Sequence, residues 1–143
     1  MKVLLTTLVL CLASSNTFAF SSAVEALRAI LPPGEYKGNA LHGECSVKVE
    51  EVNFPKQDIK VTVTSDGVSL FKLVEENSVY AINVGRKFFL QSDRTLIGKN
   101  QEHYVERLVK TVTNRDDQLN VLVSEIYVIA NGYEERTVEC NLL

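Results

Sequence analysis

The chain contains no tryptophan, and its 143 residues include only two histidines, His42 and His103, and three cysteines. A structural zinc site generally needs four Cys or His ligands at short spacings, and these residues do not cluster in that way. Neither histidine lies near a Ser or Cys in a recognisable nucleophile turn such as Gly-x-Ser-x-Gly. We therefore expect no metal or other cofactor and no enzymatic activity. A hydrolase using Glu or His would need one of the histidines in a deep cleft beside a carboxylate.

Cationic stripes and long hydrophobic runs are also scarce. The 15 basic residues are scattered among 18 acidic ones, and the net charge is −3. Because nucleic-acid binding depends on clustered basic residues, nucleic acid is not an expected partner. The one long apolar run, at residues 3–13, is about eleven residues, whereas a membrane-spanning helix needs roughly twenty. The sequence therefore predicts no membrane span.

This N-terminal run has the features of a cleaved signal peptide. Lys2 precedes the apolar stretch, and small residues at Thr17 and Ala19 stand at the two positions that a signal peptidase reads. We predict that residues 1–19 are removed and that residues 20–143 form a single domain. The single basic residue before the apolar stretch favours export to a bacterial periplasm, with extracellular secretion as the alternative.

Cleavage would remove Cys11 and leave Cys45 and Cys140. Leu10 is poorly suited to precede a lipid-modified cysteine, so we do not expect Cys11 to carry a lipid. An even number of cysteines in a chain bound for an oxidising compartment indicates a disulfide, so we predict that Cys45 and Cys140 are joined. The alternative is a pair of buried free thiols.

A short helix is predicted at the start of the mature chain. Ser22 is a suitable N-cap, and Glu25 three residues later completes a capping box. Apolar residues recur at helical spacing up to Leu31, and Pro32-Pro33-Gly34 ends the helix. This helix either caps one end of the core or acts as a lid over an opening.

From residue 34 onward the pattern is that of β-strands. Apolar and polar residues alternate at 46–52 and at 59–64, as in strands with one buried face. Asp66-Gly67 and Asn131-Gly132 are strong signals for two-residue hairpin turns. Further strands are predicted at residues 68–74, 79–84, 87–91, 96–97 and 133–142.

Two further segments are predicted to be strands, one at residues 104–113 and one at residues 119–130. Residues 104–113 fit a helical face through Val105 and Val109, but the β-branched residues at 111–113 favour a strand, which we predict. Residues 119–130 form the longest candidate strand and carry apolar residues on both faces. This pattern predicts a strand that is covered on both sides.

About eight to ten strands with short connections, and no crossover helices, predict a mainly β fold with an antiparallel meander. We expect a small closed or partly closed barrel with the short N-terminal helix at one mouth, and a two-sheet β-sandwich is the alternative. Closing a barrel brings its first and last strands together. Cys45 on an early strand and Cys140 on the last strand suit that arrangement.

The general plan resembles exported lipocalin-like barrels. It combines a signal peptide, a short helix, an early Gly34-Glu35-Tyr36, a β-meander and one disulfide. Those proteins usually carry Gly-x-Trp at the first strand, and this chain has no tryptophan. The resemblance implies the architecture and assigns no role to any residue.

The remaining hypothesis is binding through shape. We expect an exported, non-enzymatic protein that holds a small apolar or amphipathic ligand in the barrel. Inward-facing Tyr80, Tyr104 and Tyr127 would contact the ligand, and Arg136 would pair with a ligand carboxylate. The alternative is an exported protein-interaction module, without a small ligand, that binds a partner through a strand edge or an exposed patch.

Overall fold

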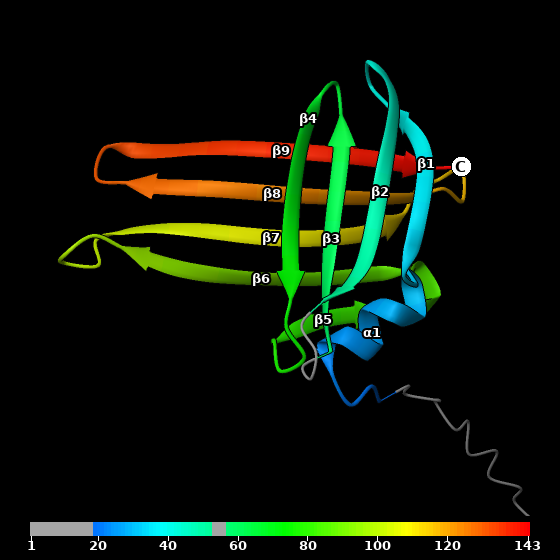
Figure 1. Cartoon of the computed structure of the whole chain (residues 1–143), viewed down its shortest axis with the longest axis horizontal. Helices are drawn as coiled ribbons and strands as arrows, with labels where there is room; N and C mark the ends of the chain where they lie inside the picture. The colour runs from blue at the N-terminus through cyan, green and yellow to red at the C-terminus, as the bar shows by residue number, and fades with distance from the viewer. Residues whose placement is uncertain (1–18, 53–56) are drawn as a thin grey trace, which may run out of the picture.

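The computed structural model describes residues 19–52 and 57–143 (Figure 1), so the predicted signal peptide lies almost wholly outside the described residues. The described chain contains one α-helix, a single 3-10 turn and nine strands. They are α1 (Ala23–Ile30), β1 (Gly34–Ala40), β2 (Gly43–Val52), β3 (Asp58–Ser65), β4 (Val68–Val74), β5 (Tyr80–Asn83), η1 (Val84–Arg86), β6 (Phe88–Ile97), β7 (His103–Thr113), β8 (Leu119–Ile129) and β9 (Gly132–Leu142). The predicted mainly β, antiparallel fold is confirmed.

The strands form one antiparallel sheet in the order β4-β3-β2-β1-β9-β8-β7-β6-β5. β1 pairs with β9, so the first and last strands lie side by side, as the barrel prediction requires. β4 and β5 are the two edges, and no pairing joins them within the described residues. The sheet is a curled half-barrel that is open between β4 and β5, which confirms the partly closed form of the prediction.

The sheet bends at the junction of β1 and β9, where only two residue pairs, Gly38–Leu142 and Asn39–Asn141, are in register. β1–β4 form one half of the sheet and β5–β9 the other, and the strands of the two halves cross at a steep angle (Figure 1). β3 and β4 pack on β8 and β9. Side chains fill the space between the halves, principally Val47, Val49, Ile59, Val61, Val63, Val74, Phe89, Val109, Val121 and Val123.

The predicted disulfide joins Cys45 on β2 to Cys140 on β9, with an S–S distance of 2.03 Å. These two strands flank β1, and Cys45 is paired with Gly38 of β1. A Cβ atom at Gly38 would lie 2.8 Å from Cys140 Sγ and 2.1 Å from the carbonyl oxygen of Asn141. Glycine at this position therefore allows β1 to fit between the two bridged strands.

Helix α1 begins as predicted, because Ser22 Oγ accepts a hydrogen bond of 3.2 Å from the Glu25 N–H. The Glu25 carboxylate accepts from the N–H and hydroxyl of Ser21, one residue before the expected capping-box partner. These bonds lower the pKa of Glu25. The helix ends at Ile30, directly before Leu31 and the two prolines.

The helix closes one end of the core. Its buried side comprises Ala23, Val24, Ala26, Leu27 and Ile30. Arg28 forms an ion pair of 2.6 Å with Glu51 on β2, and the Ala23 N–H donates to the Glu76 carbonyl in the β4–β5 connection. The helix thus packs as part of the core, in agreement with the capping interpretation.

Both predicted hairpin turns are present, and one of them lies one residue earlier than predicted. Asp66 and Gly67 have φ values of 53° and 75°, and form the predicted two-residue turn. In the β8–β9 hairpin Ile129 pairs with Gly132, so the loop residues are 130 and 131, one earlier than predicted. Gly132 begins β9 with a φ of 147°, which L side chains rarely adopt.

Two strand predictions need correction. The strands predicted at 87–91 and 96–97 are one strand, β6, because the polar residues between them are paired with β7; it begins at Phe88, and Lys87 is the C-cap of the turn η1. Asp93 lies opposite Arg107, and such opposite charges stabilise adjacent strands. The strand predicted at 79–84 is shorter and ends in the turn η1. The strand predicted at 104–113 is confirmed as β7.

Candidate binding surfaces of the open half-barrel

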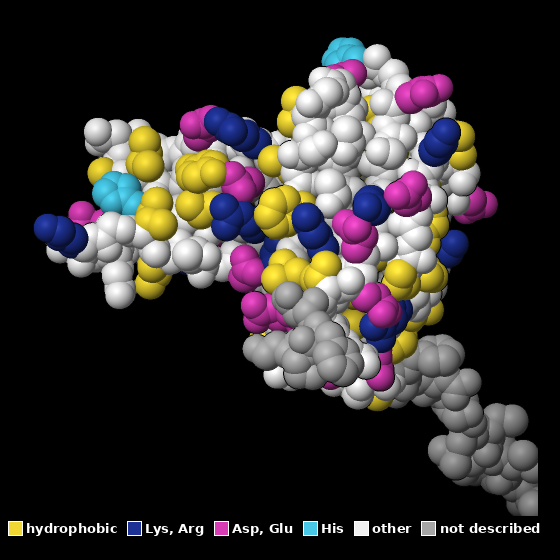
Figure 2. All heavy atoms as spheres, viewed as in Figure 1, with side chains coloured by type: hydrophobic (Ala, Val, Ile, Leu, Met, Phe, Trp, Pro, Cys, Tyr) yellow, Lys and Arg dark blue, Asp and Glu magenta, His cyan; other side chains and the backbone are white. Residues whose placement is uncertain are grey.

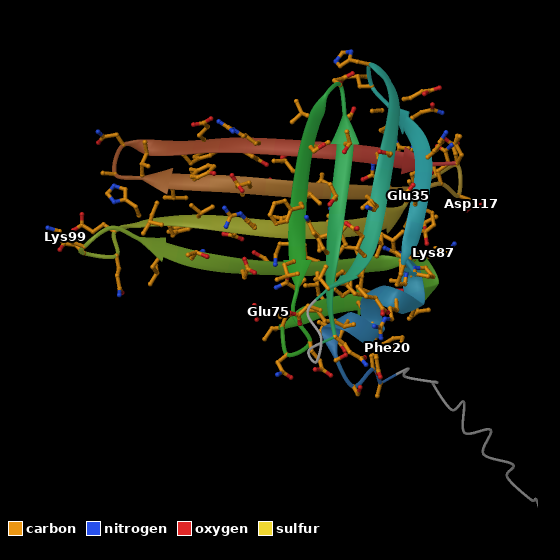
Figure 3. The ribbon with its side chains drawn as sticks, viewed as in Figure 1. Phe20, Glu35, Glu75, Lys87, Lys99 and Asp117 are labelled. Carbon is orange, nitrogen blue, oxygen red and sulfur yellow. A yellow bond between two sulfur atoms is a disulfide. The ribbon has the colours of Figure 1, made fainter. Side chains whose placement is uncertain are left out.

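Strands β6–β9 extend beyond the half of the sheet that crosses them (Figure 1). We call this projecting part, residues 92–107 and 124–137, the arm; Lys99 marks its tip in Figure 3. β5 pairs with β6 only at residues 88–91, and β1 pairs with β9 only at residues 141 and 142. Among the described residues, therefore, no strand lies beside either edge of the arm.

Side chains alternate along the strands, so the arm has two faces. The inner face continues from the core and is the face on which β4 lies; the outer face points away from β1–β4 (Figure 1). Apolar side chains are interspersed with charged ones on the side of the arm seen in Figure 2.

Four charged residues cross the inner face in one row. Asp93 of β6 lies opposite Arg107 of β7, Arg107 opposite Glu125 of β8, and Glu125 opposite Arg136 of β9. The signs alternate from strand to strand, so each charge has an opposite charge beside it. We call these four residues the charge ladder; it marks the boundary between the buried core and the open part of the inner face.

The centre of the charge ladder is tightly bonded. Arg107 Nε donates to Glu125 Oε2 at 2.7 Å, and the Tyr127 hydroxyl donates to Glu125 Oε1. Burial raises the pKa of Glu125, but the bonds from Tyr127 and Arg107 outweigh it, and the pKa is lowered overall. The same bonds to Glu125 raise the pKa of both Arg107 and Tyr127. Glu125 and Arg107 thus remain charged at neutral pH.

Lys72 connects the charge ladder to β4. Its side chain is only 2% exposed, and Nζ lies 2.6 Å from Asp93 Oδ2. Nζ also donates to the carbonyl oxygen of Leu73. This ion pair links the two halves of the sheet on the open side of the half-barrel.

The outer edge of β4 is an unpaired strand edge. β4 pairs with β3, and no strand of the described chain lies on its other side. Leu70, Lys72 and Val74 point inward, whereas Phe71 points outward and is 55% exposed, with Lys60 Nζ 4.5 Å from the centre of its ring. The open backbone edge of β4 thus stands above the inner face of the arm (Figure 1).

The outer face of the arm carries an apolar row near its tip. The row runs across all four strands and consists of Leu96, Tyr104, Val128 and Tyr133. Leu96 is 51% and Tyr133 72% exposed, and the Arg94 guanidinium lies 4.0 Å from the centre of the Tyr104 ring. A shallow hollow of 540 Å³ lies between Tyr104 and Tyr133.

The prediction that β8 is covered on both sides is wrong for the monomer. Val121 and Val123 are buried in the core, and the strands that pack on β8, β3 and β4, cover this inner side. Leu122, Ile126 and Val128 point to the outer face and are only partly buried. Alternation shows which residues share a face, but it does not show what covers that face.

The structure separates the four predicted ligand-binding residues. Tyr127 and Arg136 lie together on the inner face beside Glu125, whereas Tyr104 lies on the outer face. Tyr80 is at the opposite end of the sheet, where it stacks on Phe89 at 5.9 Å and donates to the Phe20 carbonyl. The four side chains do not converge on one site.

Sequence reasoning missed Lys72, Asp93, Arg107 and Glu125. No local motif marks them, because the charge ladder arises from the register of four strands. One contact could have been predicted from the position of the β8–β9 turn. A two-residue loop at residues 130 and 131 places Glu125 opposite Arg136.

The histidines lie apart from this region of charge. His42 is exposed in the β1–β2 turn, and His103 begins β7 near the arm tip. Within residues 19–52 and 57–143, no three Cys, His, Asp or Glu residues are grouped to hold a metal ion. No helix in these ranges has the length and apolarity to cross a membrane. Comparisons with protein-family models, curated proteins and solved structures found no match.

Proposed function

We propose that this protein is an exported, non-enzymatic binding module that takes up an extended segment of a partner protein. The segment would lie along the open edge of β4 and above the inner face of the arm. The observation that carries the proposal is the juxtaposition of the unpaired β4 edge with the uncovered inner face of the arm.

The dimensions suit an added strand. Packed sheets lie about 10 Å apart and neighbouring strands about 4.8 Å apart. Residues 92–97 of β6 extend for about 20 Å at 3.4 Å per residue, so the inner face has room beyond β4 for at least one more strand. Because the two halves cross steeply, a strand added to β4 would run across the strands of the arm (Figure 1).

The side chains exposed on the inner face of the arm indicate which residue types the bound segment would contain. An added strand directs alternate side chains to opposite faces. One set would meet Tyr127, which is partly exposed, and Ile129, which is 54% exposed; this favours apolar or aromatic residues in the segment. Arg136 is exposed and pairs only weakly with exposed Glu134, at 3.3 Å, so a carboxylate in the segment would find a cation there. Main-chain hydrogen bonds to β4 would supply sequence-independent affinity.

The filled core favours a binding site at the surface of the protein. Side chains occupy the interior of the half-barrel, and the described hollows open at the surface. We therefore favour a protein segment over a small ligand held inside the barrel. The predicted signal peptide and the Cys45–Cys140 disulfide support export to an oxidising compartment, and a bacterial periplasm is our proposal for that compartment.

The test is selection of binding peptides from a displayed library of random twelve-residue sequences. Selected peptides should bind the double variant Tyr127→Ala, Arg136→Ala at least about tenfold more weakly than the unmodified protein. The matched control is Tyr104→Ala, Arg94→Ala, which removes the same residue types from the outer face and should leave the affinity unchanged.

Two outcomes would overturn the proposal. One is a library that yields no peptide with measurable affinity for the folded protein. The other is a set of peptides whose binding is lost in the outer-face control and retained in the inner-face variant.

A further inference from the structure

We propose that the outer face of β6–β9 is the interface of a symmetric dimer formed by two copies of this chain. This face is distinct from the open side that holds the proposed segment. Its sixteen residues form four rows across four strands: Leu90, Lys110, Leu122 and Glu139; Ser92, Leu108, Ser124 and Thr137; Arg94, Glu106, Ile126 and Glu135; and Leu96, Tyr104, Val128 and Tyr133.

The outer side of β8 carries apolar residues that a single copy of the chain leaves only partly buried. These residues are Leu122, Ile126 and Val128, while β3 and β4 cover only the inner side of the strand. Strands with apolar residues on both faces are normally packed between two layers. A second sheet on the outer face would bury these residues, together with Tyr133.

The area is that of a dimer interface. Four strands and four rows cover about 19 by 27 Å, which is about 500 Å² in projection. Side-chain relief makes the accessible area larger than the projection, so the face approaches the roughly 800 Å² per partner of a standard interface. A twofold dimer uses the same patch on both copies, so one such face is sufficient.

Charge selects the direction of the twofold axis. An axis parallel to the strands, between β7 and β8, places each residue opposite the same row of the second copy. Arg94 then faces Glu135 of the other copy, and Leu96 faces Tyr133. Lys110 and Glu139 face apolar residues with either axis direction, so they do not distinguish the two. An axis perpendicular to the strands would place Arg94 opposite Ser92 and Glu135 opposite Thr137, so neither charge would gain an opposite charge.

Within the described part of one copy of the chain, the side chain of Glu135 accepts hydrogen bonds from hydroxyl groups only. Its carboxylate accepts from the hydroxyls of Ser124, at 3.3 Å, and Thr137, at 3.1 Å. Across the part of the chain that the structure describes, Glu135 has no ion pair with a cation. Arg94 is exposed and lies 3.4 Å from Glu106, so its guanidinium can also reach outward. The dimer would supply two Arg94–Glu135 pairs.

Sedimentation equilibrium of the exported protein tests this assignment. We expect the dimer mass for the unmodified protein, and dimer dissociation constants at least about tenfold higher for Arg94→Glu alone and for Glu135→Arg alone. A mixture of these two variants should form heterodimers, because each interface then contains two opposite-charge pairs. Arg136→Glu, on the inner face of β9, is the control and should remain dimeric.

A monomer at all concentrations up to about 500 μM would overturn the proposal, because an interface of this size normally supports tighter association. A dimer that is indifferent to both charge reversals, or a mixture that does not recover association, would assign the interface to another face. Circular dichroism of each variant establishes that it is folded before its mass is interpreted.

Discussion

The ammonium group of Lys72 on β4 lies 2.6 Å from the carboxylate of Asp93 on β6, and this ion pair joins the two halves of the sheet on the open side. Lys72 is buried, whereas Asp93 is half exposed. The pair also fixes the distance between the β4 edge and the charge ladder. The stability of the fold and the shape of the proposed binding surface therefore depend on the same contact.

Asp93→Asn should lower the free energy of unfolding by about 2 kcal/mol, because it leaves the buried ammonium group without its carboxylate. Adding Lys72→Met to this variant should recover part of the loss, since the unpaired charge is then removed. Guanidinium denaturation provides the measurement. Glu50→Gln, which breaks the exposed Lys48–Glu50 pair, is the control and should have no measurable effect. Equal effects of Asp93→Asn and Glu50→Gln would contradict the structural role of Lys72.

Removal of the disulfide should destabilise the protein strongly. The bond closes a loop between residues 95 apart, for which the chain-entropy model gives about 4–5 kcal/mol as an upper value. The double variant Cys45→Ser, Cys140→Ser should show this loss in denaturation without reductant. Reductant should destabilise the unmodified protein and leave the double variant unaffected. A variant as stable as the oxidised protein would contradict the account of the β1–β9 junction.

Gly38→Ala tests the close packing beneath the disulfide. The added methyl group would meet the Asn141 backbone at 2.1 Å, so β1 or β9 must move, and we expect a loss of more than about 3 kcal/mol. Gly85→Ala is the matched control, because its nearest neighbour would be 3.6 Å away. Thermal denaturation should separate the two variants clearly. Similar melting temperatures would show that β1 does not pass so close to Cys140.

Stability should fall in acid partly through Glu125. The pKa of this carboxyl is lowered in the folded protein, so the unfolded state binds its proton more readily. The contribution of Glu125 is therefore complete above its unfolded pKa of about 4.3 and is lost as the pH falls through the folded pKa. Denaturation midpoints from pH 6 to pH 3 should fall less steeply in Glu125→Gln than in the unmodified protein. Glu139→Gln, on the outer face, is the control, and an identical slope in all three proteins would refute this prediction.

Local patterns in the sequence were sufficient for much of the fold. The cap at Ser22, the turn at Asp66-Gly67, the strand at 104–113 and the Cys45–Cys140 pair follow from properties of neighbouring residues or from cysteine number. The half-barrel itself depends on the pairing of β1 with β9, which are far apart in the sequence. Alternation identifies the two faces of a strand, but it does not identify the strand that lies beside it.

The candidate site was harder to predict because it depends on register. A turn at Asn131-Gly132 would pair Glu125 with Val138, whereas the observed turn, one residue earlier, pairs Glu125 with Arg136. A shift of one residue in a turn changes the pairing by two residues and thus changes every cross-strand contact in the hairpin. The strand predicted to end at Gln91 likewise left Asp93 in a loop. In the structure β6 continues through Asp93, which places this residue beside β7.

Hydrogen–deuterium exchange of the protein with and without a selected peptide tests the proposed function most directly. We predict slower exchange for amides of β4, Val68–Val74, because the peptide would pair with that strand's free edge. Amides of the other edge strand, β5, should exchange at unchanged rates and serve as the internal control. Protection at β5 or on the outer face of the arm, with no change in β4, would contradict binding at the open side of the half-barrel.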